Sequence, residues 1–418
     1  MAIAEPCSVC GSDQIKELVG FKGQTVSHHF QMQAHDKPPR YDLALGQCQL
    51  CATVQLTKRV PISALKPRFD WIKNNEPEGH LDGLVDKLCE LPGLGKDVRI
   101  GGVSFKDDST LTRFSNRGYK NLWRVDPRAD LEVADEFVGF QAIQENLDTD
   151  RAAKIAGKYG PAGLLVARHI VEHAYGFREF LDACKRLITP NGYIVFEIPD
   201  CRRAFENLDY TTIWEEHTIY FTEKTFQRSF AYHGLSLVHF ESVSYSIEDS
   251  HIAVVRADPA VRPPAVPPED LKQELDCAER FAGAFEDKKR KIQQFIRGYK
   301  RNGRKVALFG AGHMSSAFIN MFSIQDLIDF VVDDNPDMKG LFMPGSGIPI
   351  LPSRTIYDQA VDLCILTLSA ESEKKVIANN AAFVERGGVF GSIFSGSHWA
   401  MKLPEDEPGL SRLDTALR

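Results

Sequence analysis

The proline-rich stretch from Asp258 to Pro268 constrains the fold of this chain more than any other sequence feature. It holds five prolines, at positions 259, 263, 264, 267 and 268. Proline fixes the backbone φ angle and lacks an N–H, so the stretch is expected to be a stiff, extended linker. At 418 residues the chain is also too long for one ordinary core. We therefore predict separate domains on the two sides of residues 258–268.

Between residues 66 and 257 the sequence alternates between short apolar strands and helices. A connector at 66–95 carries leucines at helical spacing, and strands are predicted at 98–103, 121–126, 162–167 and 193–198. Such alternation predicts a parallel sheet with helices on both faces, and ligands bind at the carboxyl ends of its strands. Gly101 and Gly102 end the first strand and Asp126 ends the second. We expect the glycines to approach a nucleoside-type cofactor and Asp126 to accept hydrogen bonds from its ribose.

Proton-transfer side chains are concentrated between residues 168 and 221. His169 and His173 follow one predicted strand, and Glu216, His217 and Tyr220 lie beyond the next. A histidine flanked by a carboxylate is a good base near neutral pH, because the acid fixes its tautomer and supports the cation. His217 with Glu216 matches that pattern, and Tyr220 either orients the pair or packs beside its neighbours. A purely structural role remains open for each of the three histidines.

Four of the nine cysteines form two Cys-x-x-Cys pairs, Cys7 with Cys10 and Cys48 with Cys51. Two such pairs can close a tetrahedral four-thiolate zinc site. Since four cysteines leave no open position, this zinc would be structural. Free thiols in a loop-rich segment, or a redox pair, are the alternatives. We predict a zinc-binding domain at residues 1–65.

A second strand-helix series follows the linker. A charged helix is predicted at 269–302, and strands at 305–309, 327–332, 363–367 and 388–393. The run Gly310-Ala311-Gly312 after the first strand, with Asp333 about 20 residues on, is close to a dinucleotide fingerprint. Ser315 stands where the third glycine would be. A module that helps to hold a substrate, a structural domain, and an NAD-binding domain all remain open for residues 269–418.

Composition excludes several classes of protein. The net charge of -7 argues against a nucleic-acid partner. No apolar run reaches the roughly 20 residues that span a bilayer, and the first residues have no signal-peptide pattern. We expect a cytoplasmic protein with a small-molecule substrate and no membrane partner.

In their order along the chain, these motifs resemble the sugar C-methyltransferases of deoxysugar biosynthesis. The resemblance rests on the two cysteine pairs, on residues 169–173, 190–192 and 197–199, on residues 216–221, and on residues 309–312 and 331–336. Members of that family use S-adenosylmethionine to methylate a carbon of a nucleotide-linked keto-sugar. The resemblance implies a zinc-binding domain, a Rossmann-like class I methyltransferase domain at 66–257, and a C-terminal Rossmann-like domain that helps to bind the sugar nucleotide.

The resemblance also implies roles for individual residues, with His217 as the catalytic base assisted by Glu216 and Tyr220. The implied contacts to the methyl donor are Gly101, Gly102, Asp108, Asp126 and His169. The candidate contacts to the substrate are His173, Trp214, Gly310, Gly312, His313 and Asp333, where Trp214 stands in place of a residue that is usually Tyr or His in the family. Arg99 stands where family members carry an acid. That departure keeps a catalytically decayed binding protein open, and the second glycine motif keeps an NAD-dependent oxidoreductase open.

Overall fold

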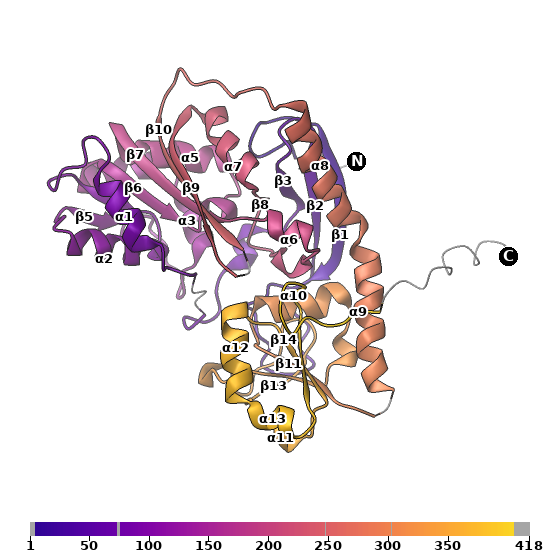
Figure 1. Ribbon diagram of the computed structural model, residues 1–418. Helices are drawn as coiled ribbons and strands as arrows, with labels where there is room; N and C mark the ends of the chain where they lie inside the picture. The colour runs from indigo at the N-terminus through magenta and orange to yellow at the C-terminus, as the bar shows by residue number, and fades with distance from the viewer. Residues whose placement is uncertain (1–4, 73–75, 247, 302, 405–418) are drawn as a thin grey trace.

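The computed structural model describes residues 5–72, 76–246, 248–301 and 303–404. Its strands form three sheets, which we call the N-terminal, central and C-terminal sheets (Figure 1). Position 302 of the predicted charged helix and the end of the predicted C-terminal domain, 405–418, lie outside the described residues. Among the described residues, no helix is both long and apolar enough to cross a membrane.

The N-terminal sheet is antiparallel, in the order β1-β2-β3-β8. Its strands are β1 (Ile15–Gln24), β2 (Tyr41–Cys48), β3 (Val54–Lys58) and β8 (Ile219–Tyr220). The first Cys-x-x-Cys pair precedes β1, and the second spans the turn between β2 and β3. The short strand β8 comes from the region after the central sheet, so the N-terminal sheet holds the segment around His217 directly.

The central sheet has the order β5-β4-β6-β7-β10-β9. Its strands are β4 (Ile100–Gly102), β5 (Leu122–Arg124), β6 (Ala162–Arg168), β7 (Ile188–Pro199), β9 (Leu235–Ser244) and β10 (Asp249–Ala257). The first four are parallel, as predicted, whereas β10 runs antiparallel to both neighbours. The predicted strands therefore form, and the hairpin of β9 and β10 is an addition that the sequence analysis missed.

Helices cover both faces of the central sheet (Figure 1). The helices between β3 and β10 are α1 (Leu81–Cys89), α2 (Asp108–Asn116), α3 (Phe140–Asn146), α4 (Thr149–Tyr159), α5 (Phe177–Arg186), α6 (Arg202–Glu206) and α7 (Glu223–Ser229), with the 3₁₀ turns η1 (Ile62–Leu65), η2 (Phe105–Asp107), η3 (Val171–His173), η4 (Tyr210–Thr212) and η5 (Phe230–His233). In α5 the buried residues Phe177, Phe180, Leu181 and Cys184 recur at helical spacing. That stripe explains why a sequence so rich in charge packs as a helix on the sheet.

The C-terminal sheet is entirely parallel, in the order β13-β12-β11-β14-β15. Its strands are β11 (Val306–Phe309), β12 (Phe330–Val332), β13 (Ile350–Leu351), β14 (Leu363–Leu366) and β15 (Val389–Ser392). Its helices are α10 (His313–Phe322), α11 (Thr355–Asp358), α12 (Ala370–Asn379) and α13 (Ala381–Glu385), with the 3₁₀ turns η6 (Gln325–Leu327) and η7 (Pro336–Met338). The central sheet, with its four parallel strands, the parallel C-terminal sheet and the small cysteine-bearing sheet confirm the predicted α/β fold class. The predicted domain limits stay predictions.

Two helices, α8 (Pro268–Gly283) and α9 (Phe285–Lys300), stand where one long helix was predicted. They run along one side of the molecule, past β1 and down to the C-terminal sheet (Figure 1). Tyr210 packs on Phe281 and Phe285, and Phe285 also contacts Phe21 of β1 and Phe322 of α10. One apolar core therefore joins the N-terminal sheet, the helix pair and the C-terminal sheet.

A buried network of charges lies where β6 and β7 end. Glu197 on β7 is fully buried and pairs with Arg168, its direct neighbour on β6. Its other oxygen is 3.0 Å from His80 Nε2, 3.3 Å from His169 Nε2 and 2.7 Å from Ser250 Oγ. Burial alone would raise the pKa of Glu197, but hydrogen bonds from His169 and His80 hold that pKa well below its ordinary value. Glu197 is therefore ionised, and its negative charge compensates the buried positive charge of Arg168.

Replacing Glu197 with glutamine should destabilise the protein by about 3–5 kcal/mol, because the buried Arg168 loses its compensating charge. Urea unfolding at pH 7 measures this, and Glu17→Gln, at an exposed position of β1, is the matched control. Because the folded-state pKa is depressed, the stabilisation by Glu197 is full above its unfolded pKa of 4.5 and is lost as the pH falls below it. The difference between the two proteins should shrink below that pH; a constant difference would contradict an ionised Glu197.

Candidate active site

The segment from Trp214 to Tyr220 carries His217 and contacts the N-terminal and central sheets. Residues 214–217 form a turn closed by His217 N–H donating to the Trp214 carbonyl at 3.0 Å. Thr218 then donates from its backbone N–H to the Glu172 carbonyl at 2.8 Å and from Oγ1 to the Ala174 carbonyl at 2.6 Å. The Thr218 carbonyl accepts from Leu56 N–H of β3 at 2.9 Å. These bonds fix His217 beside the turn η3 that follows β6.

Aromatic and imidazole rings from three regions meet around His217. Its ring centroid is 4.7 Å from that of His173 in a perpendicular arrangement, and 4.9 Å from that of Trp214. Trp214 in turn stacks on His313 of α10 at 4.8 Å and donates from Nε1 to Ser27 Oγ. Residues predicted separately as His173, Trp214, His217 and His313 therefore lie in one cluster.

The His217 imidazole has no hydrogen-bond or ion-pair partner within the described part of the chain. Burial, and then the neighbouring His313, lower the pKa of His217 to about 3. The ring is therefore neutral at physiological pH, and a nitrogen lone pair is available. Burial also lowers the pKa of His173 well below its usual range, so its ring is neutral as well.

Glu216 does not pair with His217, which corrects the expected base-acid pair. Its carboxylate lies 2.9 Å from His28 Nδ1 and 3.9 Å from His173 Nδ1. In the turn of residues 214–217, consecutive side chains point in different directions, so neighbours in sequence do not meet. Although burial lowers the pKa of His28, the Glu216 carboxylate raises it above the ordinary value. Glu216 therefore joins the central region to His28 of the N-terminal region.

Tyr220 has a structural role where a catalytic one was expected. Its side chain is buried, and its hydroxyl donates to the Trp214 carbonyl at 3.0 Å and accepts from Trp214 N–H at 3.1 Å. With both functions of the hydroxyl engaged, Tyr220 closes the turn and holds its conformation. Its ring also lies beside that of His217, with the centroids 6.3 Å apart.

A cavity of about 300 Å³ opens at the carboxyl ends of β4 and β5. Its walls come from η2, from the loop after β5, from the start of α3, from the connector and from the His217 turn; the lining residues include Phe105, Lys106, Arg128, Gln141, Phe69, Asp70, His28 and Glu216. Phe140 also lines it and packs on His173 at 4.6 Å. Both polar and aromatic groups face this space, and it reaches Glu216, which directly precedes His217. A cofactor with polar and ring-shaped parts fits such a lining.

The predicted cofactor contacts are distributed unevenly around this cavity. Gly101 faces Trp123, whose ring would be 2.6 Å from an added Cβ, so its glycine serves close packing. Gly102 similarly faces Asp107. The Asp107 carboxylate accepts from Val103 and Ser104 N–H at 2.7 and 2.8 Å. The loop after β4 is therefore shaped by Asp107, a residue that the sequence analysis did not select.

The two predicted acids lie on the surface at this edge of the sheet. Asp108 is exposed, pairs with Arg124 at 2.7 Å and does not line the cavity. Asp126 is exposed too, and its Oδ1 accepts from Arg128 and Ala129 N–H, so it caps a turn. Arg99, the departure from the family pattern, is exposed beside Gly160 and also lies outside the cavity lining. Its charge therefore does not enter the cavity.

His169 lies behind the cavity in a left-handed backbone conformation, with φ of 47°. Its Nδ1 is 3.8 Å from Glu172 Oε1 and its Nε2 is 3.3 Å from Glu197. Burial alone would lower the pKa of His169, but Glu172 and Glu197 raise it to about 10. His169 is therefore a buried cation next to the neutral His173 and His217.

The glycine loop of the C-terminal sheet is closed on itself. Asp333 accepts from Ala311 N–H at 2.9 Å with one oxygen and from Asn335 N–H at 2.9 Å with the other. Gly310 has φ of 100°, and an added Cβ would lie 2.3 Å from Leu368. Gly312 has open space beside it at the start of α10. Since Asp333 is engaged within the loop, no observation favours the alternative that it binds an NAD ribose.

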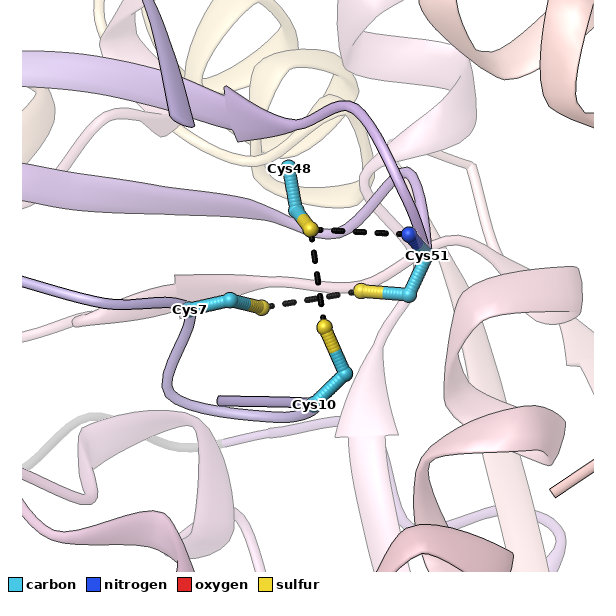
Figure 2. Close-up of side chains that lie close together, drawn as sticks. All are labelled: Cys7, Cys10, Cys48 and Cys51. Atoms are coloured by element: carbon cyan, nitrogen blue, oxygen red, sulfur yellow. Dashed lines mark hydrogen bonds between the residues drawn. The ribbon is translucent and has the colours of Figure 1, made fainter. Parts of the chain in front are cut away.

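The two Cys-x-x-Cys pairs come together in one cluster (Figure 2). Cys7 Sγ is 3.5 Å from Cys51 Sγ, and Cys10 Sγ is 3.5 Å from Cys48 Sγ. All four sulfur atoms lie within 4.8 Å of one another. A tetrahedral zinc with bonds of about 2.3 Å places its sulfur ligands about 3.8 Å apart. The cluster therefore fits a zinc ion closely.

Several residues of the site escaped the sequence analysis. His28, Phe105, Lys106 and Phe140 are far apart in sequence and belong to no motif with recognisable spacing. Glu172 of η3 lies between the predicted histidines His169 and His173 but was not selected. One sequence feature could have indicated His28: two adjacent histidines, at positions 28 and 29, directly precede an apolar residue.

Comparison with known proteins gives one match to the C-terminal part of the chain and one to nearly its whole length. Residues 268–393 match the family model described as the C-methyltransferase C-terminal domain. The chain is also 25% identical over 400 residues to C-methyltransferase NovU from Streptomyces niveus, covering 92% of this chain and 94% of that protein. These two findings confirm the predicted resemblance to C-methyltransferases.

Solved structures match the chain over a smaller part. An S-adenosylmethionine-dependent methyltransferase from Anabaena variabilis is 13% identical, with a TM-score of 0.31, and the match covers 43% of this chain and 86% of that one. The 1,6-didemethyltoxoflavin-N1-methyltransferase of Burkholderia thailandensis is 11% identical, with a TM-score of 0.29, and the match covers 43% of this chain and 79% of that one.

Replacing Cys48 with serine should remove one zinc ion per chain and lower the melting temperature by about 10 °C, because metal binding contributes directly to folding. Elemental analysis and thermal unfolding measure the two effects. Cys89→Ser, at the end of α1, is the matched control and should keep the metal. A fully metal-free wild-type protein with unchanged stability would contradict a structural zinc site.

Proposed function

We propose that this S-adenosylmethionine-dependent methyltransferase methylates a carbon beside a ketone, in a nucleotide-linked sugar or a similar small metabolite, with His217 as the general base. The observation that carries the proposal is the position of His217. Its imidazole is neutral, has no partner among the described residues, and is held next to residues that line the cavity at the strand ends. The resemblance of the sequence to sugar C-methyltransferases supports the same substrate class.

The reaction requires a base, a means to stabilise an enolate and an electrophilic methyl group. S-adenosylmethionine supplies the methyl group. A base removes the proton alpha to the carbonyl, and cationic or hydrogen-bonding groups stabilise the enolate oxygen that develops. The residues on the cavity side of the site include a candidate base and candidate groups to stabilise the enolate oxygen.

His217 can act as the base because its lone pair is not engaged by the protein. A pKa of about 3 makes it a weak base in the ligand-free protein, since burial and the nearby His313 disfavour its cation. An anionic substrate, such as a nucleotide-linked sugar, would offset those effects and raise the pKa of His217. The base would then gain strength when substrate is bound.

Two cations are placed to favour an enolate. His169 carries a proton held by Glu172 and Glu197, and Lys106 lines the cavity and pairs with Glu76 at 3.1 Å. After burial and His217, both charges contribute to the lowered pKa of His173. We assign them to stabilising negative charge as it develops on the substrate oxygen.

The cavity supports a methyl-donor site at the carboxyl ends of β4 and β5. Phe105 is 42% exposed and stacks on Phe140 at 5.0 Å, so it offers an open ring face at the cavity. Arg128 and Lys106 would hold a carboxylate or face a ribose, and the outer oxygen of Asp126 lies at the same edge. Gly102 allows the close approach of the loop after β4.

The C-terminal sheet would contribute to the substrate side. Trp214 and His313 stack on one another beside His217, and Gly312 leaves open space at the N-terminus of α10. Backbone N–H groups at a helix N-terminus favour phosphate groups. We therefore assign residues 269–418 to substrate binding, residues 66–257 to donor binding and residues 1–65 to a structural zinc domain.

Replacing His217 with asparagine should lower the methyl-transfer rate by about 10²–10⁴-fold, because asparagine cannot accept the alpha proton. The same variant should lose exchange of the alpha proton with deuterated water, followed by NMR on a nucleotide-linked keto-sugar. Exchange of the alpha proton requires only its removal and return, so it measures the base step separately from methyl transfer. His35→Asn, an exposed histidine of the N-terminal region, is the matched control.

If His217→Asn exchanges the alpha proton at the wild-type rate while it remains folded, His217 is not the base. If exchange is lost in both His217→Asn and His35→Asn, the effect is not specific to the site.

Replacing Phe105 with alanine should weaken binding of S-adenosylhomocysteine by about tenfold, since stacking of a base on an aromatic ring contributes about 1–3 kcal/mol. Isothermal calorimetry with the zinc-loaded protein measures this. Val238→Ala, a similarly exposed apolar residue on β9, is the control. Unchanged affinity in Phe105→Ala would place the donor elsewhere, and no binding to the wild-type protein would favour a decayed donor site.

A further inference from the structure

Three side chains beside the proposed base form a group with the composition of a metal site. Glu172, His173 and His217 each offer one ligand atom, and these atoms lie within 4.8 Å of one another. Glu172 and His173 are almost fully buried, and His217 is partly buried. Two imidazoles and a carboxylate are a ligand set of catalytic zinc sites and of many transition-metal sites.

One oxygen of the Glu172 carboxylate gives an independent indication of a ligand site, because it faces away from the cationic His169 and lacks a partner among the described residues. Its side chain is 2% exposed, and Oε2 is buried without a hydrogen-bond partner among the described residues. The other oxygen, Oε1, lies 3.8 Å from His169 Nδ1, which is too far for a normal hydrogen bond. A buried carboxylate oxygen with no partner is costly. A cation held between Oε2 and the two imidazoles would satisfy it.

The backbone holds the three ligands in place from both sides. Glu172 and His173 lie in the turn η3, and Thr218, next to His217, donates to the carbonyls of Glu172 and Ala174. The two imidazole rings are perpendicular, with centroids 4.7 Å apart. Ligands of a tetrahedral zinc lie about 3.4 Å apart. Side-chain rotations that move the ligand atoms by about an ångström would therefore bring them to zinc-binding distances without moving the backbone.

We propose that Glu172, His173 and His217 bind a divalent transition-metal ion such as Zn²⁺ at a second site, separate from the four cysteines. The nitrogen donors favour zinc, cobalt or nickel over magnesium and calcium, which prefer oxygen ligands. Three protein ligands leave a position open to water or to a substrate oxygen.

Metal binding at this site has a direct consequence for the reaction, which rests on the proposed role of His217. The ion would take up the lone pair that His217 needs in order to accept a proton. Occupancy of the second site and base catalysis by His217 therefore exclude one another. Transition metals should inhibit the enzyme at this site, and a chelator should restore its activity.

The test is a titration of the full-length, zinc-loaded protein with Co²⁺, with bound cobalt measured by equilibrium dialysis and by visible absorption. We expect one cobalt ion to bind without displacing the zinc. The spectrum, extended into the near ultraviolet, should lack the strong thiolate charge-transfer absorption that cobalt at the four cysteines would show. Glu172→Gln and His173→Gln should each lose this ion and keep the zinc, whereas His35→Asn should keep both.

Loss of the second ion in His35→Asn as well, or cobalt spectra dominated by thiolate absorption, would overturn the proposal. So would a wild-type protein that binds no cobalt. If a glutamine variant fails to fold, as judged by circular dichroism, His217→Gln provides the same test at the least buried ligand.

Inhibition is measured separately, by alpha-proton exchange in the presence of increasing Co²⁺. The rate should fall in parallel with occupancy of the second site and recover with a chelator that leaves the four-cysteine zinc in place. An unchanged exchange rate at full occupancy would overturn the inhibitory role. The binding result does not depend on substrate, so a failure of His217 as the base would leave the metal stoichiometry intact and distinguishable.

Discussion

The hydrogen bonds of Thr218 are the constraint on which the site depends. They connect the backbone of Glu172 and Ala174, after β6, to the turn that carries His217, and the Thr218 carbonyl connects that turn to β3. Without them, a histidine in an irregular segment would have no fixed relation to the central sheet. Through these bonds, the short segment of residues 214–220 is held by both the N-terminal sheet and the end of β6.

Charge is distributed around this frame so that proton-accepting groups stay neutral. Glu197 neutralises Arg168 and, with Glu172, keeps His169 cationic. The positive charge of His169, together with burial, keeps the rings of His173 and His217 neutral. The same arrangement leaves Glu172 Oε2 without a partner. Neutral imidazoles with available lone pairs can accept a proton or bind a metal ion. The same cluster therefore supports both proposals.

Much of the fold could be predicted from short-range pattern, and the exceptions have physical causes. Short apolar runs predicted β4, β5, β6 and β7, because the apolar residues of a buried strand are neighbours in sequence. The hairpin of β9 and β10 was missed, since β9 faces solvent for most of its length and lacks an apolar pattern. Glu216 was assigned to His217 because the two are adjacent in sequence, but in a turn adjacent side chains diverge, and Glu216 reaches His28.

The sequence by itself determined the local units of this protein: the paired cysteines, the strands with their glycines, and the stiff linker of residues 258–268. Each depends on spacing along the chain, which sets geometry over a few residues. Only the tertiary structure decided that His28, His173, His217 and His313 share one site, because their contacts cross the three sheets. It also decided which of them are neutral, since burial and neighbouring charges exist only in the folded chain.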